Sequence, residues 1–176
     1  IGPAMTRIFL HLLLLILLFT LQVSFIQALP YPLDRIPLVL VVTIYLYQYS
    51  NQTSIWWWLI SYGFVLDLLA ISVAPFEALS YAFAAFTMVL LVGHVFTNRS
   101  IYGMAGTALL CLVVLVLSEL TLVGTAHLFI STRFSWQDVV FSGLWSMGFA
   151  CFLLLFIFPF LRRIRSFLSK RLLERL

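Results

Sequence analysis

Long apolar runs alternate with short polar interruptions along the whole chain. Runs of about 20 apolar residues match the length that a helix needs to cross the hydrocarbon core of a bilayer. By this criterion the pattern predicts six membrane helices, at about residues 8–29, 36–49, 55–74, 76–96, 101–130 and 139–160.

The interruptions between these runs predict the turns. Three prolines between residues 30 and 37 separate the first two runs, and "SNQTS", Pro75, "TNRS" and "STRFSWQD" separate the others. None of these interruptions is long enough for a soluble domain. We therefore expect three parts: residues 1–4, which resemble a scar of expression cloning, a single six-helix transmembrane domain over 5–160, and a tail over 161–176.

Composition sets the class of protein. Hydrophobic residues make up 64% of the chain and charged residues 9%, whereas soluble domains have about 25% charged residues. A water-soluble fold of this size could not bury so many apolar side chains. Continuous runs also differ from the alternating segments of a membrane β-barrel. The prediction is an all-α integral membrane protein whose first segment is a retained helix, although it resembles a signal peptide.

The basic residues predict an orientation. With six spans, both termini lie on one side, and that side receives Arg7, Arg99 and the basic tail, which together hold eight of the ten Lys and Arg residues. Because positive loops stay on the cytoplasmic side, we expect both termini to be cytoplasmic.

The tail has helical periodicity, with leucine and isoleucine near one face and basic residues over much of the rest. We expect this amphipathic segment to lie on anionic lipid, or against a cytoplasmic partner, and we favour lipid. No nucleic-acid partner is expected. The binding residues would be Arg162, Arg163, Arg165, Lys170 and Arg171.

Three ionisable residues lie deep within the predicted spans: Asp67, Glu119 and His127. A central Asp costs about 2.5–3.5 kcal/mol to insert, so such groups usually face the protein interior. Gly63 lies one turn before Asp67 and would let another helix approach closely. A relay of protons or substrate through these groups is one interpretation. We favour the other, in which they form internal hydrogen bonds that hold the fold.

The sixth run has small residues at helical spacing, Ser142, Ser146 and Ala150, with Gly143 beside them. Small side chains permit tight helix packing. Intramolecular packing is the simpler interpretation. The alternative is that these residues form a groove that binds the transmembrane helix of another protein.

The sequence shows no motif for chemistry. There is no Ser-His-Asp order, no HExxH, and no CxxC around Cys111 or Cys151. We therefore expect no catalytic residues, no metal site and no cofactor.

The order of these features resembles the bacterial rod shape-determining protein MreD family. The resemblance covers nearly the whole chain from Met5. It is carried by "LQVSFIQALPYP" at the exit of the first helix, "IPLVLVVTIYLYQ" in the second, "GFVLDLL" from Gly63 to Leu69, the basic loop "TNRS" and the basic tail. The chain has "AISVAPFEALS" where the family has a Gly-rich turn.

The resemblance implies a non-enzymatic subunit of the cell-elongation machinery in the bacterial inner membrane, which supports cell shape and lateral peptidoglycan synthesis. Its partner would be a bitopic MreC-type protein and, indirectly, RodA, a class B penicillin-binding transpeptidase and MreB. The family is related in fold to the S components of energy-coupling-factor vitamin transporters, which is the alternative function. S components dock through alanines at four-residue spacing in the first helix, and this chain has none between residues 7 and 22.

Overall fold

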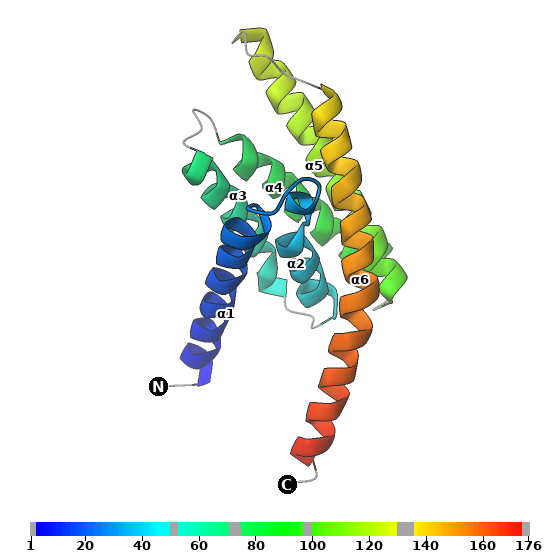
Figure 1. The fold of residues 1–176 in the computed structure, drawn as a ribbon. Helices are drawn as coiled ribbons and strands as arrows, with labels where there is room; N and C mark the ends of the chain where they lie inside the picture. The colour runs from blue at the N-terminus through cyan, green and yellow to red at the C-terminus, as the bar shows by residue number, and fades with distance from the viewer. Residues whose placement is uncertain (1–2, 50–52, 71–74, 97–99, 130–135, 174–176) are drawn as a thin grey trace.

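The computed structural model describes residues 3–49, 53–70, 75–96, 100–129 and 136–173. Within these ranges it contains six α-helices, which confirms the predicted all-helical membrane bundle. The bounds are α1 Pro3–Thr20, α2 Leu38–Tyr49, α3 Trp56–Ala70, α4 Phe76–Leu90, α5 Ile101–Phe129 and α6 Trp136–Leu173 (Figure 1). Single turns extend or join them: π-helices η1 (Leu21–Ile26) and η4 (Leu91–Val95), and 3-10 turns η2 (Leu33–Arg35) and η3 (Thr53–Ile55).

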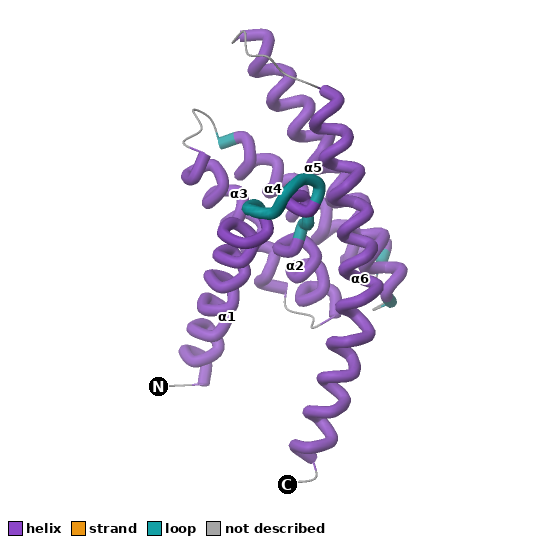
Figure 2. Tube along the Cα trace, in the orientation of Figure 1, coloured by secondary structure: helices purple, strands orange, loops and turns teal. Residues whose placement is uncertain are grey.

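Helix length and composition support a chain that crosses the membrane several times. Three helical segments are long and apolar enough to span a bilayer: Phe76–Val95, Ile101–Leu122 and Trp136–Phe156. Two shorter apolar helical segments, His11–Ile26 and Trp56–Ala70, accompany them. Lipid offers no hydrogen bonds to the backbone, so such segments form helices, in which the backbone groups bond to one another. Figure 2 shows helix in nearly all of the described chain, with loop around residues 27–37.

The short helix α2 forms the centre of the bundle. Its 12 residues span about 18 Å, less than the hydrocarbon thickness of a bilayer. Val39, Leu40, Val41 and Ile44 are all 2% exposed or less. They pack in one apolar cluster with residues of α3, α4, α5 and α6, so neighbouring helices enclose α2.

The first and last helices place their outer ends on the same side of the bundle. The start of α1 and the end of α6 lie at the same end of the bundle, and these two helices diverge on either side of α2 (Figure 1). Helix α6 continues through Pro159 to Leu173. The backbone of the predicted tail is thus helical and continuous with the last span, whereas the side chains of residues 160–173 lie outside the description.

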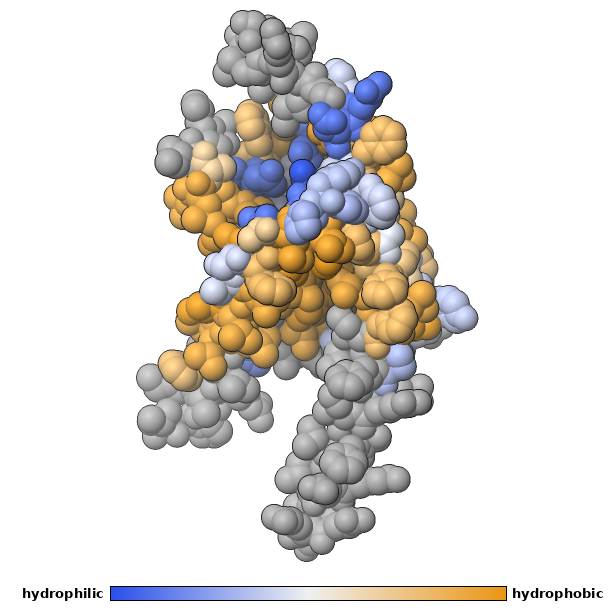
Figure 3. Space-filling model, viewed as in Figure 1, coloured by the Kyte–Doolittle hydropathy of each residue, from blue (hydrophilic) through white to orange (hydrophobic). Residues whose placement is uncertain are grey.

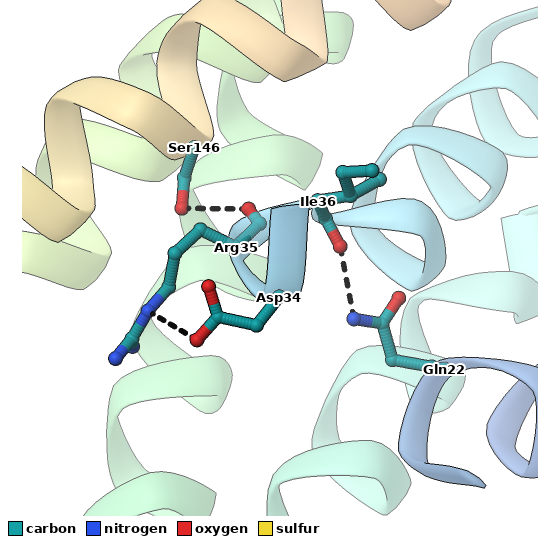
Figure 4. Close-up of polar contacts among 5 residues, drawn as sticks. All are labelled: Gln22, Asp34, Arg35, Ile36 and Ser146. Carbon is teal, nitrogen blue, oxygen red and sulfur yellow. Dashed lines mark hydrogen bonds and ion pairs between the residues drawn. The ribbon is translucent and has the colours of Figure 1, made fainter. Parts of the chain in front are cut away.

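Gln22 ties the end of the first helix to the start of α2. It lies in η1 and is buried; its amide nitrogen donates to the carbonyl of Ile36 at 2.9 Å, and its amide oxygen accepts from the N–H of Leu38 at 3.0 Å. Figure 4 shows the first of these bonds. Both backbone groups flank Pro37, where helical pairing is interrupted. They also bond to each other, from the N–H of Leu38 to the carbonyl of Ile36 at 3.0 Å, so Gln22 gives each of them a second partner.

Replacement of Gln22 by Leu tests this tie. Leu has a similar volume but removes the side-chain partner of a partly buried carbonyl and N–H, which keep only their bond to each other. We therefore expect a loss of about 1 kcal/mol in the free energy of unfolding. The measurement is reversible unfolding in mixed micelles. Thr20→Val is the control, because the hydroxyl of this exposed residue bonds only to its own helix; its effect should stay within about 0.5 kcal/mol. Equal stability of the Q22L variant and the wild type would contradict the tie.

Candidate functional site

Asp67 joins α3 to the beginning of α4. Its carboxylate is buried and accepts two backbone hydrogen bonds, from the N–H of Glu77 at 3.1 Å and from the N–H of Ala78 at 2.7 Å. The first N–H groups of a helix have no partner within that helix, and Pro75, which precedes α4, supplies no side-chain cap. Asp67 therefore caps α4 from the neighbouring helix, where its negative charge also suits the positive end of the helix dipole.

Gly63 permits this contact. It lies one turn before Asp67 and is buried. A Cβ at this position would lie 2.7 Å from the carbonyl oxygen of Glu77 and 2.9 Å from both Ala78 Cα and Tyr81 Cβ. Because real side chains do not pack at such distances, only glycine lets the backbones of α3 and α4 approach this closely. Gly63 and Asp67 together form one joint, which we call the α3–α4 joint.

The small residues of α6 are engaged within the chain. Gly143 packs against Val116 of α5, where a Cβ would clash with the valine side chain, and Ala150 is buried in the core. The Ser146 hydroxyl donates to the carbonyl of Arg35 at 2.9 Å (Figure 4). Ser142 is half-buried. These contacts correspond to the intramolecular packing that was the simpler interpretation of the sequence. Ser142, Gly143 and Ser146 also line a cavity.

A polar cavity of about 200 Å³ lies beside the α3–α4 joint. Helices α3, α4, α5 and α6 form its walls, and the segment from η1 to α2 closes one side. In Figure 3, hydrophilic residues gather in a hollow of the surface, above a broad hydrophobic band. Its polar lining includes Gln27, Asp34, Arg35, Glu77, Ser80 and Glu119.

The segment between α1 and α2 contributes an ion pair to this cavity. Nε of Arg35 lies 3.1 Å from Oδ2 of the adjacent Asp34, and the carbonyl of Arg35 is held by Ser146 (Figure 4). Gln27, from the same segment, and Tyr62 of α3 both line the cavity. The hydrogen bond from α6 thus holds this segment in place as one wall of the cavity.

The structure brings only some of the predicted residues together. Asp67 and Gly63 meet at the joint, whereas Glu119 is exposed rather than buried and lines the cavity. The side chain of His127 lies outside the description, as do those of the predicted tail-binding residues Arg162, Arg163, Arg165, Lys170 and Arg171. Gln22, Glu77 and Ser80 were not predicted as site residues. Of these three, Gln22 lies within a segment that carries the family resemblance, "LQVSFIQALPYP".

The fold and this site define a class: the chain is a multi-span helical membrane protein with a polar cavity beside a tightly packed helical hairpin. Comparisons of the chain with models of protein families, with curated proteins and with solved structures found no match. Among the residues that the structure describes, no group of three or more His, Cys, Asp or Glu side chains is placed to hold a metal ion.

Proposed function

We propose that this chain is a non-enzymatic membrane subunit of the bacterial cell-elongation complex, similar to the MreD family, and that it acts by binding the transmembrane helix of a bitopic MreC-type partner. Through that partner it would contribute to lateral peptidoglycan synthesis together with RodA, a class B penicillin-binding transpeptidase and MreB. Its place would be the inner membrane, with both termini in the cytoplasm.

The α3–α4 joint is the observation that supports this proposal. The motif that carries most of the resemblance is "GFVLDLL", and its Gly63 and Asp67 are the two residues that hold α3 against α4. In the structure, Gly63 allows close packing and Asp67 caps α4. A rigid hairpin of this kind suits a protein that presents a fixed surface to another membrane protein.

A partner helix would need an apolar face that the bundle leaves uncovered. The small-residue face of α6 packs within the chain and lines the cavity, but the opposite side of that helix exposes large apolar residues, among them Leu144, Trp145 and Phe152. In α1, Phe9 and Leu17 are exposed as well. Helices associate in lipid through packing and interhelical hydrogen bonds, so a partner would gain contact on such a face by displacing lipid.

Co-purification from native membranes tests the proposal. The chain would be extracted under mild conditions, and the proteins retained with it would be identified and quantified by mass spectrometry. We expect strong enrichment of one bitopic MreC-type protein. Because Gly148 has open space around it, a G148W variant, which would obstruct that side of α6, would show whether the retained protein contacts this helix. Recovery of an ATPase-bearing transport module in place of the bitopic protein would contradict the proposal and favour the S-component alternative.

A further inference from the structure

The cavity beside the α3–α4 joint has an excess of negative charge. Its lining contains three carboxylates, of Asp34, Glu77 and Glu119, and one guanidinium, of Arg35. Arg35 is already paired with Asp34. Glu77 and Glu119 line the same small cavity from two different helices, where two negative charges would repel each other.

The position of Glu77 follows from the joint. Its backbone N–H is held by Asp67, and this fixes the first turn of α4 against α3. The Glu77 side chain lines the cavity from that turn, and Glu119 lines it from α5. The two acidic groups therefore come from different helices that are packed together, so packing maintains their repulsion. A cation between them would relieve that repulsion, because it attracts both carboxylates.

Ser80 provides a second, independent indication of a ligand. It lines the cavity and is 4% exposed. Hydroxyls of other helical residues, such as Thr43 and Thr107, donate to the carbonyl four residues earlier. The Ser80 hydroxyl makes no hydrogen bond to any residue that the structure describes. Its oxygen is also not one of the fully buried side-chain atoms that lack a hydrogen-bond partner in the described part of the chain. A buried polar group generally has a partner, so this hydroxyl is open to a molecule in the cavity.

We propose that the cavity binds a small organic cation with an ammonium group, held between Glu77 and Glu119 with the Ser80 hydroxyl as a further acceptor. An ammonium has three donors and no acceptor, which matches a lining of carboxylates and hydroxyls. Tyr62 and Tyr81, whose rings meet edge to face, also line the cavity and offer the aromatic surface that organic cations favour. Among the described residues, no group of three or more His, Cys, Asp or Glu side chains is placed to hold a metal ion, which favours an organic cation over a metal.

The proposal does not depend on the proposed partner. A chain that failed to bind an MreC-type protein could still hold a cation, and a chain without a cation site could still bind that partner. The two ideas are therefore tested by different experiments.

Binding of diaminobutane to the purified full chain in lipid nanodiscs tests the cation site. Butanediol is the matched probe, because it has the same carbon chain with hydroxyls in place of ammonium groups. We expect diaminobutane to give saturable heat in titration calorimetry and to raise the midpoint of thermal unfolding, and butanediol to do neither. The double variant E77Q/E119Q should bind diaminobutane at least tenfold more weakly.

Two further variants locate the site. D138N removes an exposed acid at the start of α6, outside the cavity lining, and should leave the affinity unchanged, whereas S80A should weaken binding several-fold. Since Glu119 is exposed, E119Q alone tests the charge with little risk to folding and should also bind more weakly. Equal binding of the diol and the diamine, or wild-type affinity in E119Q and in the double variant, would overturn the proposal.

Discussion

Replacement of Asp67 by Leu is expected to lower the free energy of unfolding by about 2–6 kcal/mol, because it removes the side-chain partner of two partly buried backbone donors. Those donors are the N–H groups of Glu77 and Ala78, at the start of a helix that has no other described cap. Asn retains one acceptor oxygen but brings an NH₂ group to the second donor. Its loss should therefore be about half that of Leu.

The cost of inserting Asp67 into the membrane acts in the opposite direction to the loss of its hydrogen bonds, so the two contributions can be separated by experiment. A central Asp costs about 2.5–3.5 kcal/mol on insertion scales, so Leu should insert more readily and accumulate at least as well in the membrane. In the folded bundle the carboxylate already has its hydrogen bonds, and their loss should outweigh the gain in transfer. Good insertion with poor stability is the expected combination.

The measurement is unfolding in mixed micelles, together with the thermal midpoint in nanodiscs. The matched control is Asp138→Leu, which removes an exposed acid from the first turn of α6 and should cost no more than about 1 kcal/mol. Wild-type stability in D67L would show that the cap has no energetic role, and the interpretation of the joint would then be wrong.

The sequence predicted the helices well because lipid leaves the chain little choice. Apolar runs of sufficient length must satisfy their backbone internally, and prolines between residues 30 and 37 separate the first helix from α2 as expected. The predicted ends of the helices were less accurate than their positions. The sixth helix was expected to stop near residue 160, but α6 continues to Leu173, since the amphipathic tail keeps the same helical period.

The partner of Asp67 could not be predicted in the same way. The favoured interpretation gave Asp67 internal hydrogen bonds but named no donor, and two of the donors are backbone N–H groups of a neighbouring helix. Every residue except proline has such a group, so no residue type marks the partner. The sequence indicated only that Gly63, one turn earlier, allows a close approach.

The cavity could not be predicted from the sequence either. Glu119 was expected in the interior because its surroundings in the chain are apolar, but it is exposed and faces a space that several other elements enclose. Its neighbours there include Glu77, which is 42 positions away in the chain. Proximity of this kind depends on how the helices cross, and the periodicity of a single helix does not contain that information.

Replacement of Gly63 by Ala is expected to destabilise the chain even though alanine is the better helix former. Alanine gains about 1 kcal/mol in helix propensity, but its Cβ would lie 2.7 Å from the carbonyl oxygen of Glu77. That atom belongs to the backbone, so only separation of α3 from α4 relieves the clash. Overpacking typically costs about 1–3 kcal/mol, and we expect a net loss of up to about 2 kcal/mol, larger for Val.

The matched control is Gly148→Ala, because no atom lies within 4 Å of the added Cβ; there the propensity gain should remain, and stability should hold or rise. Separation of the helices by Gly63→Ala would also lengthen the bonds that Asp67 makes one turn away. The variants G63A and D67N should therefore destabilise the chain by less together than the sum of their separate effects, since residues that share one contact are not additive. Strict additivity in this double-mutant cycle would mean that Gly63 and Asp67 act independently and that the joint is not a single unit.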